Sequence, residues 1–131
     1  FACCIYATAP FVFAADLRRG FELLNLQGAE YAFSVTSYPF PIQRAVKITD
    51  KHRIEMFTPE YFQSRSQDLE EAFHDAGQFY CGRTQSWLDA KPVFSPSSYL
   101  YELPQHLVQD IDTADDWLRA ELLHQLLLRQ P

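Results

Sequence analysis

The chain has 131 residues, of which 47% are hydrophobic and 15% aromatic. This is enough apolar material for one folded domain, and it excludes an intrinsically disordered chain. The formal net charge is −6, from 17 acidic and 11 basic side chains. A nucleic-acid-binding protein needs a basic face to neutralise phosphates, so that class is not expected. No apolar run reaches the roughly 18 residues of a membrane span, and no signal peptide is visible, so no membrane association is expected.

The three cysteines are Cys3, Cys4 and Cys81. Neighbouring residues in a strand point to opposite faces, so Cys3 and Cys4 are not expected to pair with each other. The odd count and the absence of a C-x-x-C spacing are typical of reduced, buried thiols. This pattern favours a cytoplasmic protein.

The chain opens on the unbroken apolar run FACCIYATAPF, residues 1–11. Such runs are typical of central strands in parallel sheets, which are covered on both faces. A domain rarely begins inside its innermost strand. We therefore expect residues 1–131 to be the C-terminal part of a larger domain.

A helix is predicted next, from about Ala14 to Gln27, with Gly28 ending it. Its buried stripe is expected to consist of three apolar residues at helical spacing, Leu17, Phe21 and Leu24. The β-branched and aromatic run 31–38 then predicts a strand. Strand, helix and strand together predict a βαβ unit.

The segment of about 39–63 has a different composition. Two short strand-like runs, Ile42–Ile48 and Arg53–Phe57, flank a polar stretch, which predicts a β-hairpin. A projecting hairpin that carries Met56 and Phe57 is a candidate dimerisation arm. Folding back onto its own domain is the alternative.

Further elements follow at closer spacing. Arg65, Gln67 and Asp68 form a polar cluster that favours the start of a helix-like stretch. The later segments predict, in order, a strand over Gln78–Cys81 after Gly77, a short helix over residues 84–90 and a strand over residues 98–103.

The last predicted helix runs to about Gln130. Thr113 and Asp116 have the spacing of an N-terminal capping box. Two apolar stripes follow, Trp117, Ala120, Leu123 and Leu127 on one and Leu118, Leu122 and Leu126 on the other. Because the two stripes together form a wide apolar face, we expect this helix to pack against a sheet.

Asp110 and Asp112 are candidate metal ligands. In an extended segment, residues two apart project to the same side, so both carboxylates could reach one hard cation such as Mg²⁺. The C-terminal edge of an α/β sheet, just before a helix, is also where such folds bind ligands. The alternative is that acidic residues here only stabilise a helix start, and this is the role we assign to Asp115 and Asp116.

Two other polar or aromatic groups have structural explanations. His74 and Asp75 could act as an acid–base pair, but adjacent residues seldom orient each other, and loop or capping roles are more typical. Tyr80 follows Phe79 in a predicted strand, where core packing is the ordinary role. No glycine-rich phosphate loop, nucleophile elbow or metal-type Cys/His spacing occurs.

Several stretches occur together in one known family. CCIYATAPF (3–11), HDAGQFY (74–80), SPSSYLYELP (95–104) and QDIDT (109–113) stand in this order. In this the chain resembles the acylneuraminate cytidylyltransferases, and within them most closely the branch that acts on pseudaminic acid. The resemblance implies an α/β, Rossmann-like three-layer fold of the glycosyltransferase-A type. That fold has a mixed sheet flanked by helices and a projecting β-hairpin.

The resemblance also implies a reaction and a cofactor. The family transfers a cytidylyl group from CTP to a nonulosonic acid and releases pyrophosphate. By this likeness Asp110 and Asp112 hold Mg²⁺ and are the catalytic residues. One of them is a candidate for deprotonating the sugar hydroxyl, although a metal-bound hydroxyl needs no separate base.

The sugar contacts implied by the resemblance are Tyr80, Tyr6, Thr8, Arg65, Gln67 and Gln43. The sequence departs from the sialic-acid enzymes on this side. Tyr-Ala-Thr-Ala-Pro stands where they have Gln-Pro-Thr-Ser-Pro, Gln43 stands in place of a lysine, and Ser66 in place of an arginine. These departures favour a sugar other than N-acetylneuraminate, with other contacts to the sugar carboxylate than in the sialic-acid enzymes.

The family forms homodimers through its hairpin region, which implies that Gln43 and Arg65 act across a subunit interface. Its Gly- and Arg-rich nucleotide loop has no counterpart in this chain, so no nucleotide-binding residue is assigned and the chain alone is expected to be inactive. Alternative interpretations are another sugar nucleotidyltransferase, for sialic acid or Kdo, and a non-catalytic interaction module.

Overall fold

The computed structural model describes residues 1–26 and 28–129. These residues form two compact units. One unit combines residues 1–36 with the chain from residue 75 onward, and the other is Ser37–His74.

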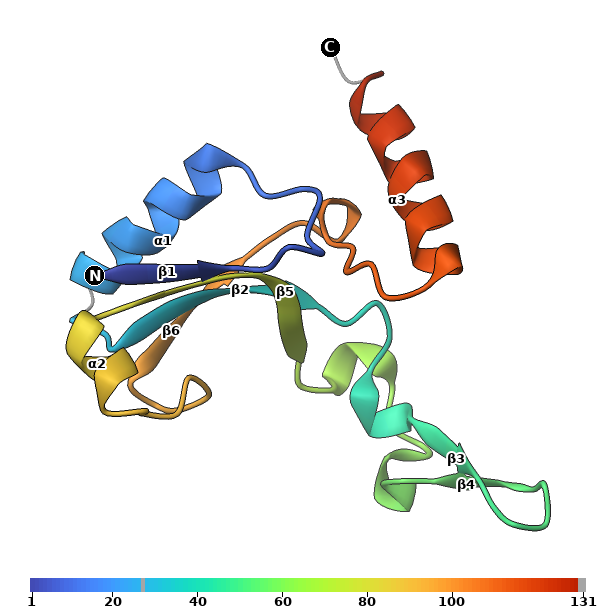
Figure 1. Cartoon of the computed structure of the whole chain (residues 1–131). Coiled ribbons are helices and arrows are strands. Elements are labelled where there is room, and N and C mark those ends of the chain that lie inside the picture. Colours follow the sequence, from blue (N-terminus) through green and yellow to red (C-terminus); the bar gives the residue numbers. More distant parts are fainter. Residues whose placement is uncertain (27, 130–131) are drawn as a thin grey trace. The chain divides into compact units, whose positions relative to one another are not determined.

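The first unit is built on a four-stranded sheet with the order β1-β5-β2-β6 (Figure 1). The strands are β1 (Ala2–Ile5), β2 (Tyr31–Ser37), β5 (Phe73–Gly82) and β6 (Ser98–Glu102). β1 pairs with β5 antiparallel, whereas β2 pairs with β6 parallel. The expected α/β class with a mixed sheet is therefore confirmed.

The helix α1 (Ala14–Leu26) lies along one face of this sheet (Figure 1). Leu24 is fully buried, and Leu17 and Phe21 pack against the same core, so the predicted apolar stripe is confirmed. The predicted last residue of the helix, Gln27, lies outside the described residues. Gly28 has a φ of +62°, as expected of a residue that ends a helix in the left-handed region.

The expectation for the first strand is wrong in its position. β1 lies at an edge of the described sheet and not at its centre, and β5 separates it from β2. Both Ile5 and Cys4 are exposed. A run of apolar residues indicates that a strand can be covered on both faces, but it does not specify which strands lie beside it.

The strand β5 is longer than predicted, because it begins at Phe73 and not at Gln78. Gly77 lies within it with a φ of +62° and does not precede it. The short helix α2 (Thr84–Leu88) and the strand β6 confirm the two predictions that follow in the chain.

The last helix, α3 (Ala114–Leu127), begins where it was predicted to begin, but its packing differs from the prediction. The hydroxyl of Thr113 accepts a hydrogen bond from the backbone N–H of Asp116, and the Asp116 carboxylate accepts one from the backbone N–H of Thr113. The predicted packing of both apolar stripes against a sheet is wrong, since Ala120 is the single buried residue of α3. Four of the large apolar residues are exposed, Trp117, Leu118, Leu122 and Leu126. The predicted end at Gln130 lies outside the described residues.

The unit Ser37–His74 contains the predicted hairpin. β3 (Val46–Ile48) and β4 (Ile54–Met56) pair antiparallel, with Ile48 opposite Ile54. The first predicted strand was too long, because Ile42–Arg44 form a 3₁₀ turn. None of the residues of this unit is buried.

The helix-like stretch predicted after Arg65 is also wrong. Ser66–Asp68 form one 3₁₀ turn, and Leu69 already has extended backbone angles. The segment then continues in extended form, with the carbonyl of Ala72 accepting a hydrogen bond from the Tyr38 N–H. This hydrogen bond joins the segment to a residue 34 positions earlier, a contact that the local helix signal does not reveal.

The described residues contain no helix that is long and apolar enough to cross a membrane. All three cysteines are free thiols. Cys81 is buried and Cys3 is partly buried, but Cys4 is exposed, which corrects the expectation that all three are buried.

Candidate functional site

The candidate site is organised around a turn-like irregularity in β5. Gly77 has a positive φ of 62°, which a glycine adopts at little cost. Its N–H donates a hydrogen bond of 2.9 Å to Oδ1 of Asp75. The hydroxyl of Tyr80 donates a short hydrogen bond to Oδ2 of the same carboxylate. Asp75 therefore fixes both the backbone at Gly77 and the orientation of the Tyr80 ring.

Tyr80 is buried and its phenol is held in the protonated form. Burial raises the pKa of Tyr80 far above its ordinary value, and the Asp75 carboxylate raises it further. The ring of Tyr6 lies 5.2 Å from that of Tyr80, centroid to centroid. Phe33 stacks on Tyr80 at 6.0 Å. Tyr80 can therefore act as a hydrogen-bonding or apolar contact, and not as a base near neutral pH.

Asp110 lies directly against this turn. A Cβ atom placed on Gly77 would be 3.4 Å from Oδ2 of Asp110, so the carboxylate approaches the backbone where no side chain is present. The other oxygen, Oδ1, is buried and has no hydrogen-bond partner among the described residues. A buried carboxylate oxygen without a donor is costly unless a cation, a donor or water satisfies it.

The loop after β1 reaches the same place. The carbonyl of Thr8 accepts a hydrogen bond of 3.2 Å from the N–H of Ile111, which separates Asp110 from Asp112. Earlier in the same segment, the N–H of Tyr6 donates to the carbonyl of Gln78 at 2.9 Å. Three stretches that are distant in the sequence are thereby joined through backbone hydrogen bonds.

Asp112 is exposed and begins the approach to α3. Its N–H donates to the Asp116 carboxylate at 3.3 Å, and the Thr113 hydroxyl donates to the same oxygen at 2.7 Å. The hydrogen bond from Thr113 lowers the pKa of Asp116 below its usual value. Asp116 is thus committed to the helix cap, as predicted, while the Asp112 side chain is directed to solvent.

The donor set fits a small hard cation in part. Asp110 and Asp112 would supply two carboxylates, and Mg²⁺ usually takes one or two carboxylates together with phosphate oxygens and water. The unpartnered Oδ1 of Asp110 is the observation that favours a cation there. Among the described residues, no group of three or more His, Cys, Asp or Glu side chains is arranged to hold a metal ion. A cation at this place would therefore depend on ligands from the substrate.

A pocket of about 220 Å³ lies beside the aromatic pair. Its lining is mostly apolar and aromatic, and consists of Cys4, Tyr6, Asp75, Tyr80, Trp87, Val93 and Phe94. Neither Asp110 nor Asp112 lines it. The predicted sugar contacts Tyr6 and Tyr80 thus share one pocket, and the predicted metal ligands are not part of its lining.

Three predicted contacts, Gln43, Arg65 and Gln67, belong to the separate unit Ser37–His74. Nε2 of Gln43 donates to the carbonyl of Glu70 at 2.9 Å, and its Oε1 is buried without a partner among the described residues. The guanidinium of Arg65 forms an ion pair with Asp68 at 2.8 Å. This pair would have to open before Arg65 could bind the carboxylate of a sugar.

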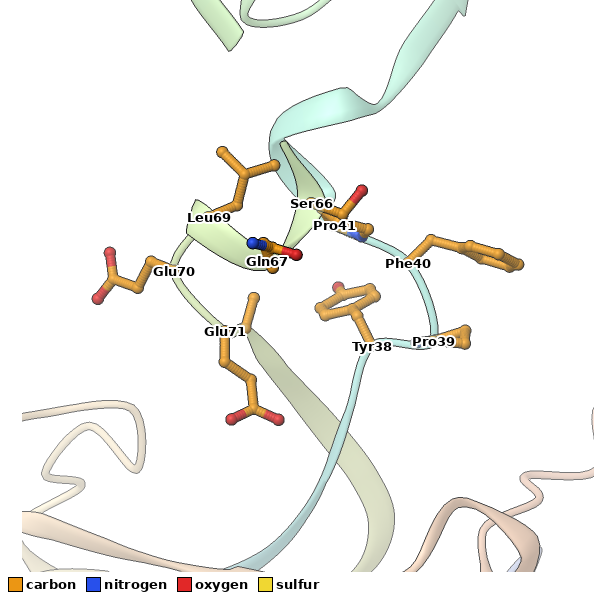
Figure 2. Close-up of a pocket in the computed structure, with 10 residues that line it drawn as sticks. Tyr38, Pro39, Phe40, Pro41, Ser66, Gln67, Leu69, Glu70 and Glu71 are labelled. Atoms are coloured by element: carbon orange, nitrogen blue, oxygen red, sulfur yellow. The ribbon is translucent and has the colours of Figure 1, made fainter. Parts of the chain in front are cut away.

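Gln67 lines an open pocket of about 260 Å³ within this second unit. Figure 2 shows its amide between Leu69 and Pro41, with the carboxylates of Glu70 and Glu71 directed away from it. The pocket wall is formed by the segments 38–41 and 66–72. Its lining offers an uncharged amide and apolar surface, and contains no lysine or arginine side chain among the described residues.

The acid–base role considered for His74 and Asp75 stays a prediction, and each residue has a structural contact of its own. The His74 ring packs against Tyr38 at 4.8 Å, whereas Asp75 accepts the hydrogen bonds from Gly77 and Tyr80. Asp75 is the residue whose role the sequence did not reveal. The available signal was the Asp-x-Gly spacing, which is typical of a side chain that bonds its own backbone two residues on.

Comparison with known proteins identifies relatives over almost the entire chain. It is 39% identical over 124 residues to the pseudaminic acid cytidylyltransferase of Campylobacter jejuni subsp. jejuni serotype O:2, which covers 95% of this chain. The chain is a homologue of the pseudaminic acid cytidylyltransferases. The family resemblance noted in the sequence is thereby confirmed.

The chain spans about half the length of these relatives, 53% in the case of the Campylobacter jejuni protein. The serotype O:23/36 protein of the same species matches equally, with 39% identity. A Helicobacter pylori protein named pseudaminic acid cytidylyltransferase and UDP-2,4-diacetamido-2,4,6-trideoxy-beta-L-altropyranose hydrolase is 34% identical over 111 residues. The match covers 84% of this chain and 21% of that protein. No family model matches the chain.

Proposed function

We propose that this chain is the C-terminal part of a cytoplasmic cytidylyltransferase that transfers a cytidylyl group from CTP to pseudaminic acid and releases pyrophosphate. The observation that carries the proposal is the identity of 39% over 95% of the chain to pseudaminic acid cytidylyltransferases. On this proposal the mixed sheet belongs to a Rossmann-like nucleotidyltransferase fold. The rest of that fold, with the nucleotide loop, lies in the part of the relatives that this chain does not span.

The geometry of the first unit supports the proposal. Thr8, Gly77 and Ile111 belong to three of the stretches on which the resemblance rests, and they meet at one place. The hydrogen bond from Ile111 to Thr8 and the approach of Asp110 to Gly77 join these stretches. Side chains that are 33 or more residues apart can act on one substrate only when the fold brings them together in this way.

In this proposal Asp110 and Asp112 hold Mg²⁺ together with the triphosphate. The ion would neutralise charge on the phosphates and on the departing pyrophosphate. Asp110 is positioned by its contact with Gly77, and Asp112 by the capped start of α3. The capping box therefore has a second effect, because it fixes the backbone that carries the Asp112 carboxylate.

Tyr6 and Tyr80 would bind the sugar through the pocket that they share. The raised pKa of Tyr80 keeps its phenol neutral, and its proton is engaged with Asp75. The ring rather than the hydroxyl proton is thus what Tyr80 offers to the pocket. An aromatic and apolar wall suits acylamino and deoxy positions of a sugar better than it suits hydroxyl-rich ones.

The proposed quaternary state is a homodimer formed through the Ser37–His74 unit. This unit has no buried residue, and Ile48 and Ile54 of its hairpin are 76% and 78% exposed. An isolated two-stranded hairpin is marginally stable in water, so a surface of this kind requires a cover. A second copy of the same hairpin, related by two-fold symmetry, would supply one.

The test uses a full-length protein that includes this chain. It is incubated with CTP and Mg²⁺, with pseudaminic acid, N-acetylneuraminic acid and Kdo offered in parallel, and pyrophosphate release is followed. Release with pseudaminic acid is the expected result, and its loss by at least about a hundredfold is expected in Asp110→Asn with Asp112→Asn. Asp115→Asn is the matched control and should retain activity.

Other results would change the proposal in different ways. Release only with N-acetylneuraminic acid, or with Kdo, would retain the reaction and overturn the substrate. A folded protein that releases no pyrophosphate with any of these sugars would exclude the reaction and favour a non-catalytic interaction module.

A further inference from the structure

Two of the three thiols face each other on neighbouring strands of the sheet. Cys3 of β1 is directly opposite Cys81 of β5 in the antiparallel register, and their sulfur atoms are 3.3 Å apart. Both are free thiols, and together they contact the core under α1. A disulfide would need the sulfur atoms at about 2 Å, which is a small side-chain rotation from the observed distance.

The backbone geometry at this pair suits a cross-link. The N–H of Tyr6 bonds to the carbonyl of Gln78, so Tyr6 and Gln78 are a hydrogen-bonded pair of the ladder. Hydrogen-bonded and non-hydrogen-bonded pairs alternate, which places Cys3 and Cys81 at a non-hydrogen-bonded pair. Their Cα atoms are then about 4.5 Å apart, within the range that disulfides span without moving the backbone.

Cys4 provides an internal contrast. It is the neighbour of Cys3, but it points to the other face of β1, where it is exposed and lines the pocket with Tyr6 and Tyr80. Its partner in the register is Tyr80 and not Cys81. The fold therefore distinguishes two adjacent cysteines by the side of the strand on which they lie.

We propose that Cys3 and Cys81 are an oxidant-sensitive modification site that closes to an intramolecular disulfide. The oxidant is a peroxide. Attack of the Cys3 thiolate on hydrogen peroxide breaks the O–O bond and gives a sulfenic acid and hydroxide, which takes up the thiol proton as water. The sulfur of Cys81 then attacks this sulfenic acid, the S–O bond breaks and a second water leaves. Two thiols lose two electrons in total, and one peroxide is reduced to two waters.

The order of attack follows from the surroundings of the two sulfurs. Cys81 is fully buried, and burial together with the Cys3 sulfur raises the pKa of its thiol, so it is a poor first nucleophile. Cys3 is partly exposed at the edge strand and is the thiol that peroxide can reach. Cys81 is then already in place as the resolving thiol.

The cross-link would fasten an edge strand that is otherwise held on one side in the described sheet. β1 pairs only with β5 there, and it leads directly into Tyr6 and Thr8. A disulfide between Cys3 and Cys81 closes a long loop, and we expect it to raise the melting temperature by about 5 °C or more. The proposal is independent of the cytidylyltransferase activity.

The test compares three single variants of the full chain with the unsubstituted chain. Each is treated with a small excess of hydrogen peroxide, and the remaining thiols are alkylated. Cleavage after arginine gives the peptides 1–18, with Cys3 and Cys4, and 66–83, with Cys81. The disulfide-linked pair of peptides is quantified by mass spectrometry, and non-reducing electrophoresis confirms that the product is a monomer.

The expected result is that Cys4→Ser forms the linked peptides as the unsubstituted chain does and that dithiothreitol releases them. Cys3→Ser is expected to form at least tenfold less, and Cys81→Ser none. Equal yields from Cys3→Ser and Cys4→Ser would overturn the proposal, because they would mean that the fold does not select the pair. An unfolded chain would also give equal yields from these two variants, and this result would likewise count against the proposal. Linked peptides found only in dimers would overturn it as well.

Discussion

The carboxylate of Asp110 lies over Gly77, at the one place in β5 where the backbone has a positive φ and no side chain. A Cβ on Gly77 would be 3.4 Å from Oδ2 of Asp110 and 3.7 Å from its carboxyl carbon. The absence of a side chain thus lets the carboxylate lie close to the backbone of β5. This relationship connects a backbone property of one motif to the proposed metal ligand of another.

Replacement of Gly77 by alanine should therefore have two effects. The positive φ of 62° makes alanine unfavourable by about 1 kcal/mol, which lowers the free energy of unfolding. The new methyl group also covers Oδ2 of Asp110, so Mg²⁺ should bind more weakly to the full-length protein. Urea denaturation measures the first effect, and calorimetric titration with Mg²⁺ and CTP measures the second.

Gly28→Ala is the matched control for this change. Gly28 also has a φ of 62°, but nothing lies within 4 Å of a Cβ placed there. It should lose a similar free energy of unfolding and keep its affinity for Mg²⁺. Equal weakening of Mg²⁺ binding in both variants would show that general destabilisation, and not the contact with Asp110, is responsible.

The cap of α3 should contribute stability that depends on pH. Thr113→Ala removes the hydroxyl that accepts from the Asp116 N–H, and should cost about 1 kcal/mol of unfolding free energy. The pKa of Asp116 is lowered from 3.8, first by the hydrogen bond from Thr113. A lowered folded-state pKa means that the contribution is complete above pH of about 4. It is lost as the pH falls through the lower, folded-state pKa.

Asp116→Asn should accordingly be less stable than the unsubstituted chain at pH 7, and the difference should shrink as the pH falls below 3.8. Urea denaturation followed by circular dichroism at several pH values gives this difference. Asp115→Asn changes a charge in the same first turn without a capping hydrogen bond, and should show little effect. A difference for Asp116→Asn that is constant with pH would contradict the proposed ionic cap.

A second pH effect is expected in alkali. The hydroxyl of Tyr101 in β6 donates to Oδ1 of Asp16 in α1 at 2.8 Å. Burial, and after it this carboxylate, raises the pKa of Tyr101 to about 12. Because the folded-state pKa is raised, the contribution of this group is present below pH of about 10 and is lost as the pH rises through about 12.

Tyr101→Phe removes the hydrogen bond and should lower the free energy of unfolding at pH 7 by no more than about 1 kcal/mol. It should also make stability less sensitive to pH between about 10 and 12, as measured by denaturation across that range. Tyr99→Phe, at an exposed position of the same strand, is the control and should leave both properties unchanged. Identical alkaline profiles for Tyr101→Phe and the unsubstituted chain would exclude this role for Tyr101.

The sequence was sufficient where the deciding contacts are local. The capping box of Thr113 and Asp116 and the pairing of β3 with β4 were predicted correctly because each depends on residues a few positions apart. The stripe of α1 was also correct, since helical periodicity indicates a buried face directly.

Prediction was wrong where partners are distant. The apolar run of β1 did not reveal an edge position, and the apolar surface of α3 did not reveal that most of it is exposed. The aspartates of the candidate site were proposed from their spacing and from the family likeness, and their role as metal ligands stays a prediction. Their contact with Gly77, which is 33 positions before Asp110, required the fold.

The hairpin of the Ser37–His74 unit gives the sharpest test of the proposed dimer. Its two faces differ: Ile48 and Ile54 lie directly opposite each other on the apolar face, and Lys47 pairs with Glu55 at 3.6 Å on the other. Replacing both isoleucines by threonine retains the β-branched shape that strands favour and removes much of the apolar surface. The dissociation constant of the dimer, measured by sedimentation equilibrium, should rise at least about tenfold.

Lys47→Ala with Glu55→Ala is the matched control on the opposite face. This exposed ion pair contributes little, so its removal should change the dissociation constant much less. An equal effect of both double variants would indicate that they act by weakening the hairpin itself. A protein that is monomeric before any substitution would exclude the hairpin dimer, and the apolar face would then have to be covered by another part of the full-length protein.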